Sequence, residues 1–272
     1  MAEAEIDLVV NAFERTYRET LTPGVFPRIE EENRRRFARK VALINNVADP
    51  ADARSRAESL VGRGEIDAFF FVADRLERAL RTCSLTRAEL GRIPHYSDCA
   101  LVAVTLEGSP FLLYWDAEVH LDRPCNWVDP AAGLMEADRR VFAANPTSWR
   151  REVDWSTFDH TGPFALGYGF SDAVFLGRRA DFSRPIYRDR CLISLRYPLS
   201  HIAADFEQRV DAHMRRHRLL RATHTGVVYR HPESEGGGYP KPTLLEALRH
   251  VRNHLIVRAA ARSYIDHPCL KV

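Results

Sequence analysis

Two carboxylates separated by one residue, Asp116 and Glu118, follow an apolar run at 111–115. Such a run predicts a buried strand, and in an extended chain residues two apart point to the same side. Carboxylates so close repel each other, and a divalent cation shared with a phosphate would remove that cost. Mg²⁺ and Mn²⁺ prefer oxygen ligands of this kind. The Asp-Ala-Glu motif therefore indicates a metal-assisted phosphate site, and solvated turn acids are the alternative.

The composition is that of an ordinary globular protein. The chain has 272 residues, of which 45% are hydrophobic and 28% charged, so it can bury a real core in one large domain or two small ones. A net charge of +2 is too small to indicate nucleic-acid binding. The five cysteines include no Cys-x-x-Cys pair. With no signal peptide and no run of about 20 apolar residues, we expect a cytoplasmic protein without an integral membrane segment.

The elements that must position the two carboxylates alternate along the first two-fifths of the chain. Apolar runs predict strands at 6–11, 41–47, 66–72 and 111–115. Helices are expected between them, at about 23–36, from Asp49-Pro50 to 62–64, and from Ser97 to about Gly108. This alternation predicts an α/β fold with a mostly parallel sheet flanked by helices. In such sheets ligands bind outside the carboxyl ends of the strands, which is where Asp116 and Glu118 would lie.

Four segments occur in an order that resembles the nucleotide-binding half of a GT-A-fold glycosyltransferase, close to the family 2 type. They are NAFERT (11–16), INNVADP (44–50), IDAFFFVAD (66–74) and FLLYWDAEVHL (111–121). The resemblance covers about residues 5–232 and implies a Rossmann-like, mostly parallel central sheet. It implies a domain at 1–232, with a nucleotide-sugar-binding half at 1–122 and an acceptor half at 123–232. A loop and a C-terminal helix are expected at 233–272.

The resemblance implies metal-dependent transfer of a sugar, with inversion, from a UDP- or GDP-linked donor to a hydroxyl acceptor. The Asp-Ala-Glu motif stands where the family has Asp-x-Asp, so Asp116 and Glu118 would bind Mn²⁺ or Mg²⁺. His231 would be a further ligand, with His224 as the alternative. Contacts to the donor are expected from Asn11, Phe13, Glu14, Arg15, Asn46, Asp74, Tyr96, Asp98, Trp115 and Asp116. For Trp115, packing in the core is the alternative.

A general base is expected near the start of a helix in the second half. Phe206, Val210 and Met214 recur every four residues and predict the buried face of that helix. The resemblance makes Asp205 the base that takes the proton from the acceptor hydroxyl, with Asp172 as its rival. The adjacent Glu-Asp pair of the family is absent. A carboxylate at position 205 could instead complement the helix dipole.

Two other functions fit the same fold. A nucleotidyltransferase would usually carry a glycine-rich, basic loop after the first strand, where this chain has NAFERTYRE. A non-catalytic nucleotide-sugar-binding protein would fit the Glu that replaces the second Asp of the motif.

The C-terminal helix has a capping box at 243–246 and an apolar face formed by Leu244, Leu248, Val251 and Leu255. We expect this face to pack on the domain. The alternatives are a homodimer contact and a peripheral position on a membrane surface.

Overall fold

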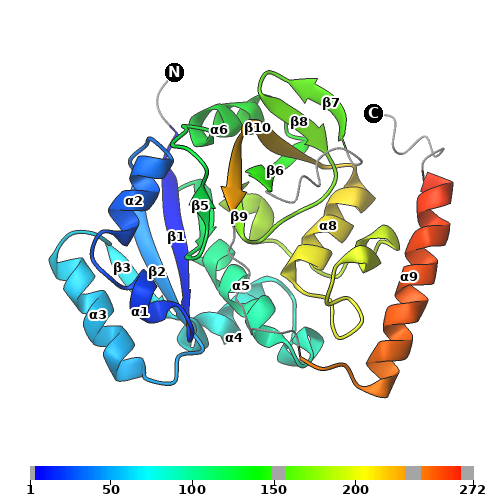
Figure 1. Cartoon of the computed structure of the whole chain (residues 1–272), viewed down its shortest axis with the longest axis horizontal. Helices are drawn as coiled ribbons and strands as arrows, with labels where there is room; N and C mark the ends of the chain where they lie inside the picture. Colours follow the sequence, from blue (N-terminus) through cyan, green and yellow to red (C-terminus); the bar gives the residue numbers. More distant parts are fainter. Residues whose placement is uncertain (1–3, 149–156, 231–239, 265–272) are drawn as a thin grey trace.

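In the computed structural model, which describes residues 4–148, 157–230 and 240–264, one sheet runs through the molecule (Figure 1). Its strands are β1 (Ile6–Phe13), β2 (Arg39–Asn45), β3 (Ala68–Phe71), β4 (Phe111–Asp116), β5 (His120–Leu121), β6 (Val141–Ser148), β7 (Thr157–Thr161), β8 (Phe164–Gly167), β9 (Val174–Arg178) and β10 (Leu220–Arg230). The α-helices are α1 (Tyr17–Thr20), α2 (Val25–Glu32), α3 (Pro50–Gly62), α4 (Val72–Thr82), α5 (Asp98–Thr105), α6 (Val128–Ala137), α7 (Arg179–Phe182), α8 (Phe206–His217) and α9 (Leu244–Tyr264). The 3₁₀ helices are η1 (Arg87–Leu90), η2 (Pro94–Tyr96) and η3 (Ile193–Arg196).

The sheet is mixed, with strand order β3-β2-β1-β4-β9-β6-β10-β8-β7, and β5 pairs with β10. Strands β1, β2, β3 and β4 of the first half are parallel to one another. Strand β9 is antiparallel to both β4 and β6, and β8 is antiparallel to β10 and β7. The predicted α/β class, with a central sheet flanked by helices and a C-terminal helix, is confirmed. Every antiparallel pair includes β8, β9 or β10 of the second half, for which the apolar runs did not specify strands.

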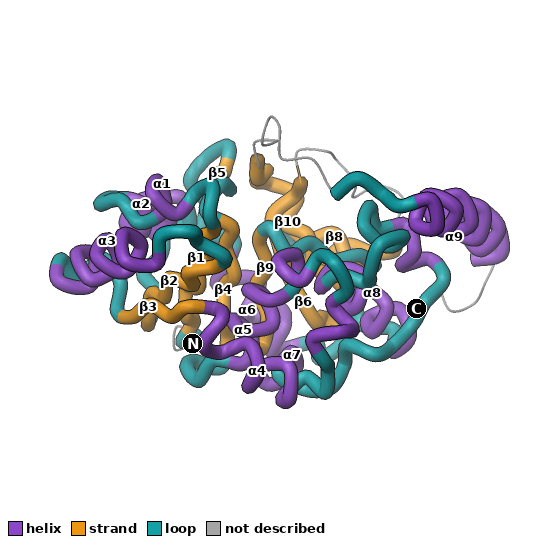
Figure 2. The backbone as a smooth tube through the Cα atoms, turned by 90° about the horizontal axis from the view of Figure 1, so that it is seen from below, coloured by secondary structure: helices purple, strands orange, loops and turns teal. Residues whose placement is uncertain are grey.

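Two hydrophobic cores cover the two faces of the sheet. One contains Leu8 and Val10 of β1 and packs under α2, α3 and α6. The other contains Val9 of β1 and packs under α4, α5 and α8 (Figures 1 and 2). Because both faces are covered, the central strands are almost wholly apolar, which is why the apolar runs located them correctly. Phe206, Val210 and Met214 of α8 are fully buried in the second core, as their spacing predicted.

Local signals explain where several elements begin. The Asp49 side chain accepts a hydrogen bond from the Asp52 backbone N–H at 3.0 Å and caps α3, with Pro50 at the first helical position. The helix expected at 23–36 is shorter, because α2 ends at Glu32 and Arg34 has a positive φ of 46°. Gly177 in β9 is required by a close approach, since a Cβ there would lie 2.6 Å from the buried Phe182 ring.

A buried ion pair ties the start of β1 to the second half of the chain. Arg179 donates to Asp7 Oδ2 at 2.7 Å, and the exposed fractions of the two side chains are 10% and 2%. The same guanidinium donates to the carbonyl oxygens of Ala103, Leu106 and Ser109. Ser109 in turn donates to Asp7 through its hydroxyl and its backbone N–H. Both buried charges are therefore well supplied with hydrogen bonds.

The C-terminal helix α9 lies at the opposite end of the molecule from α3 (Figures 1 and 2). The predicted capping box forms, since Thr243 N–H donates to Glu246 at 2.7 Å and Glu246 N–H to the Thr243 hydroxyl at 3.3 Å. The prediction that the apolar face packs on the domain was wrong. Its members are 58–79% exposed: Leu244, Leu248, Val251 and Leu255.

Polar side chains make the contacts of α9 instead. Glu246 is buried and accepts two hydrogen bonds from Arg92, at 2.6 and 3.0 Å. Asn253 is also buried and donates to the Ser200 hydroxyl at 3.2 Å. A period of four residues locates an apolar face but does not say what covers it. Contact of the exposed face with a second subunit or a membrane surface remains a prediction.

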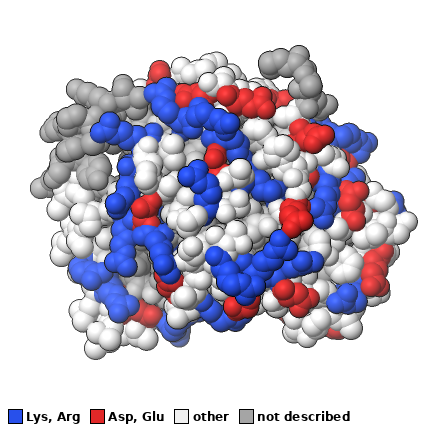
Figure 3. Space-filling model, turned by 180° about the vertical axis from the view of Figure 1, so that it is seen from behind, with Lys and Arg blue, Asp and Glu red and all other residues white. Residues whose placement is uncertain are grey.

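Two further observations concern the described helices and one face of the surface. Within the described ranges, no helix combines the length and the apolar character that a bilayer crossing demands. The face in Figure 3 carries Lys and Arg side chains with Asp and Glu side chains among them. It therefore does not present a field of one sign, in keeping with the small net charge.

Candidate functional site

Polar side chains meet where the parallel strands β1, β2 and β4 end. Asn11 of β1 is aligned with Asp116 of β4, and Asn45 is the last residue of β2. Asn11 and Asn45 are buried, and Asn11 Oδ1 has no hydrogen-bond partner among the described residues. A buried oxygen without a donor is costly, and such atoms are often satisfied by a ligand, an ion or water. Both asparagines lie on the side of the sheet covered by α4 and α5.

Asp98, at the start of α5, belongs to the same group of polar side chains. Asn45 donates to Asp98 Oδ1 at 2.9 Å, and Asn46 donates to Asp98 Oδ2 at 3.3 Å. Burial raises the pKa of Asp98, while the hydrogen bonds from Asn45 and from the Cys99 N–H oppose this shift. Asn46 has a positive φ of 51° and is exposed, so its amide lies between the network and solvent. The structure thus brings two predicted donor contacts, Asn46 and Asp98, together.

Tyr96 lies close to this network along the chain. It is the last residue of η2, two residues before Asp98, and its side chain is half-buried.

The Asp-Ala-Glu motif spans the end of β4 and a turn. The strand ends at Asp116, and Val119 N–H donates to Asp116 O at 2.9 Å, which closes the turn. Glu118 is therefore a turn residue, and strand alternation does not determine the direction of its side chain. Asp116 N–H donates to Ala173 O at 2.8 Å, which places the loop before β9 alongside the motif. This long-range contact brings Asp172 into the site.

Three further carboxylates come from the second half, and Asp172 is the one that links the other two to Asp116. Asp172 N–H donates to Glu207 Oε1 at 3.0 Å, and Asp205 caps α8 by accepting from Gln208 N–H at 2.8 Å. Burial, followed by the charges of Glu207, Asp205 and Asp116, raises the pKa of Asp172 well above its ordinary value.

Burial and then Glu207 also raise the pKa of Asp205 to about 7. The pKa of Glu207 itself is raised by burial. Like charges gathered at one place and shifted in pKa are typical of functional sites.

Hydrogen bonds from β10 and from Tyr197, which follows η3, hold the loop that carries Asp172. The Ser171 and Tyr229 hydroxyls are 3.0 Å apart, and the Tyr197 hydroxyl bonds both the N–H and the carbonyl of Phe170. Gly169, with a φ of 118°, lies against the guanidinium groups of Arg196 and Arg221. Two cations thus lie under a loop that carries an acid. Sequence reasoning did not place Glu207, Arg196 or Arg221 in the site, because only the tertiary fold brings them to Asp172.

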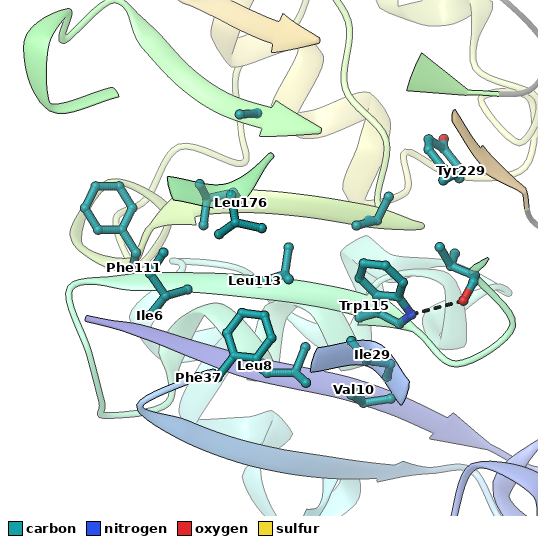
Figure 4. Packing of buried hydrophobic residues seen from close by; sticks show 14 of the residues in the cluster. Ile6, Leu8, Val10, Ile29, Phe37, Phe111, Leu113, Trp115, Leu176 and Tyr229 are labelled. Carbon is teal, nitrogen blue, oxygen red and sulfur yellow. Dashed lines mark hydrogen bonds between the residues drawn. The ribbon is translucent and has the colours of Figure 1, made fainter. Parts of the chain in front are cut away.

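Trp115 does not belong to the site. The indole is fully buried in the core under α2, α3 and α6, and its Nε1–H donates to Val119 O at 3.2 Å (Figure 4). Strand alternation turns Trp115 and Asp116 to opposite faces of β4. The expected contact of Trp115 with the donor is therefore wrong, and the core alternative holds.

Asp116, Asp172, Asp205 and Glu207 form the acidic cluster, and several other predicted residues do not belong to it. Glu14 and Arg15 are exposed in the loop after β1, and Phe13 is half-buried at the end of that strand. Glu14 accepts from Ala48 N–H, which ties this loop to the loop after β2. Asp74 is exposed in the first turn of α4, a favourable position for an acid near a helix N-terminus.

Of the two histidines considered as metal ligands, His231 lies outside the described residues. His224 is buried in β10 against the ring of Phe164, and its Nδ1 accepts from Gly226 N–H at 3.2 Å.

The acidic cluster is not the place where three metal-ligating side chains converge most closely. Among the described residues, the group of three whose ligand atoms all lie within 4.8 Å of one another is Asp189, His213 and His217. Asp116 would therefore need ligands from elsewhere to complete a coordination sphere.

Comparison with known proteins identifies the fold. No protein-family model matches the sequence, and no curated protein sequence matches it. The structure is similar to a crystal structure of GalNAc-T7 with UDP, GalNAc and Mn²⁺, with a TM-score of 0.57 and 13% identity over 97% of this chain. This chain has a GT-A-type glycosyltransferase fold. It spans half the length of the GalNAc-T7 chain.

A second structure, mouse xyloside xylosyltransferase 1, has a TM-score of 0.47 and 13% identity, covering 88% of this chain and all of that one. In this GT-A fold, the acidic cluster lies where β4 of the first half meets β9 and α8 of the second.

Proposed function

We propose that the chain is a metal-dependent glycosyltransferase that moves a sugar from a nucleoside-diphosphate donor to a hydroxyl acceptor with inversion. The observation that supports this most is the gathering of Asp116, Asp205 and Glu207 around Asp172, where β4 of a GT-A-type sheet ends. Asp116 comes from the half predicted to bind the donor, and the other three acids come from the half predicted to bind the acceptor. Holding two substrates together in the right geometry lowers the barrier to their reaction, and a site between the two halves could do this.

The residues present fit a hard divalent cation. Asp116 and Glu118 offer carboxylate oxygens, and the unpartnered Asn11 Oδ1 lies on the neighbouring strand. Mg²⁺ and Mn²⁺ prefer such oxygen ligands and share them with substrate phosphates. In the proposal Asp116, Glu118 and His231 would hold the ion, and the ion would supply positive charge to balance that of the departing diphosphate. The similar GalNAc-T7 structure, which contains UDP and Mn²⁺, is in keeping with this choice.

The donor nucleotide is proposed to lie along the ends of β1 and β2. Asn11, Asn46 and Asp98 offer amide and carboxylate groups there, and Tyr96 precedes Asp98. Arg15 is exposed in the loop after β1, where a guanidinium suits a diphosphate. Phe13, Glu14 and Asp74 stay as predicted contacts at the same edge of the sheet.

Asp205 is the proposed general base. A base works best when its pKa lies near the operating pH, and burial raises the pKa of Asp205 to about 7. Its N-cap hydrogen bond occupies one carboxylate oxygen, Oδ1, so Oδ2 would take the proton of the acceptor hydroxyl. Asp172 remains the rival because its loop lies beside Asp116, and burial raises its pKa well above the ordinary value.

Thermal unfolding with a panel of nucleoside diphosphates and nucleotide sugars, with and without Mn²⁺, tests the proposal. We expect one nucleotide to raise the melting temperature of the wild type only with metal. At a hundred times the dissociation constant the stabilisation is about 2.7 kcal/mol. The rise should vanish in Asp116→Asn and persist in Glu136→Gln, a matched control that removes an exposed charge from α6.

Product analysis with the nucleotide that binds then separates the three functions. A glycosyltransferase releases the nucleoside diphosphate when an acceptor is supplied. A nucleotidyltransferase would instead release pyrophosphate from a nucleoside triphosphate, and a binding protein would show binding without turnover. If Asp116→Asn kept the metal-dependent rise, the placement of the donor site at Asp116 would be wrong.

A further inference from the structure

A second group of metal-ligating side chains lies at the opposite end of α8 from Asp205. His213 and His217 are one turn apart on this helix, and Asp189 comes from the loop between α7 and η3. Asp189 Oδ2 is 2.7 Å from His213 Nδ1 and 3.1 Å from His217 Nε2. The three side chains are 22%, 14% and 50% exposed, in that order, so the group is half-buried and open to solvent on one side.

Two of the three separations between ligand atoms are close to those of a tetrahedral metal site. With bonds of about 2.0–2.1 Å to nitrogen and oxygen, ligand atoms in a tetrahedron lie about 3.3 Å apart. The two measured separations, 2.7 and 3.1 Å, fall short of this by a few tenths of an ångström. Small side-chain rotations would therefore admit an ion. The imidazole rings are already near each other, with centroids 4.4 Å apart.

The surroundings of Asp189 leave one of its carboxylate oxygens for the imidazole rings of His213 and His217. Arg216 Nε lies 3.3 Å from Asp189 Oδ1, so the arginine pairs with one oxygen while Oδ2 points to the two imidazoles. His213 also packs against the buried ring of Phe142, with centroids 5.6 Å apart, which fixes its orientation. Residues four apart on a helix share a face, so the helix itself holds the two rings together.

We propose that Asp189, His213 and His217 bind a transition-metal ion of the Zn²⁺ class. Two imidazoles and one carboxylate suit Zn²⁺, Co²⁺ or Ni²⁺ better than Mg²⁺ or Mn²⁺. Three protein ligands leave a fourth position, which the exposed side of His217 opens to water. The ion would tie the loop containing Asp189 to the last turns of α8. This inference does not depend on the proposed transferase activity, because the site shares no ligand with the acidic cluster.

Calorimetric titration of the full metal-free chain with Zn²⁺, and absorption spectroscopy with Co²⁺, test the site. We expect one ion per chain, the visible bands of four-coordinate Co²⁺, and no competition from excess Mg²⁺. His217→Ala and Asp189→Asn should each weaken binding at least tenfold. His217 is half-exposed, so its truncation should leave the fold intact, and thermal unfolding without metal checks this.

Two control variants make the result decisive. His254→Ala breaks another pair of histidines four apart, His250 and His254 on α9, whose rings are 4.8 Å apart. Asp116→Asn removes the proposed donor-site ligand. Both should bind Zn²⁺ as the wild type does. The proposal is overturned if the wild type does not bind, if His217→Ala binds normally, or if either control abolishes binding. A loss in Asp116→Asn alone would assign the ion to the acidic cluster.

Discussion

Asp205 caps α8 and is also the proposed general base, and replacing it by Asn separates these two roles. Asn caps a helix about as well as Asp, so the hydrogen bond to Gln208 N–H at 2.8 Å should persist in Asp205→Asn. The amide cannot accept a proton, so a general base would be lost. We expect kcat for sugar transfer to fall by about 10²- to 10⁴-fold. Asp205→Ala would lose the cap as well, at a further cost of about 1 kcal/mol in the free energy of unfolding.

The same substitution should change how stability depends on pH. The pKa of Asp205 is about 7 in the folded chain and 3.8 in its ordinary state, so between these values the folded state binds more protons than the unfolded state. The free energy of unfolding therefore falls as pH rises through this window, by at most about 1.4 kcal/mol per pH unit for one proton. Asn does not titrate. The stability of Asp205→Asn relative to wild type should thus increase from pH 4 to pH 7.

Urea unfolding at several pH values, together with turnover assays, measures both effects. Asp49→Asn is the matched control, because Asp49 also caps a helix but is exposed and lies in the first half. It should leave kcat unchanged. Undiminished kcat in Asp205→Asn would exclude Asp205 as the base and favour Asp172. A stability difference that stays constant from pH 4 to pH 7 would show that burial does not raise the pKa of Asp205.

Two further predictions concern the packing that supports the site. Gly177→Ala places a methyl group against a buried ring and should cost about 1–3 kcal/mol, whereas Gly133→Ala, in open space on α6, should stabilise by about 0.5–1 kcal/mol. Arg179→Met leaves the buried carboxylate of Asp7 unpaired and should cost about 3–5 kcal/mol, against about 1 kcal/mol or less for the exposed Arg140→Met. Urea unfolding measures all four, and equal losses in the two arginine variants would contradict the ion-pair argument.

The first half of the fold was predictable because its signals are local. Central parallel strands covered on both faces have continuous apolar runs, and these located β1 to β4 within a few residues. Asp49 and Pro50 marked the start of α3 for an equally local reason. Asp116 at the end of β4 followed from the same apolar run.

What the sequence could not supply depends on contacts between distant residues. Asp172 reaches Asp116 only because β9 pairs with β4 in the antiparallel sense, and no local pattern specifies that pairing. Glu207 joins the cluster for the same reason, through the N–H of Asp172. The apolar face of α9 was visible in the sequence, but polar contacts such as that of Asn253 decide how the helix docks.

The continuous sheet has a consequence for recombining this chain with others. The predicted boundary after residue 122 separates two halves of sequence, yet β9 of the second half bonds along β4, and β5 of the first half bonds to β10. A fragment ending at that boundary would leave the apolar strand β4 as an unprotected edge, open to pairing with other chains. Chimeras joined there should aggregate, whereas grafts confined to the loops that follow the strands should fold.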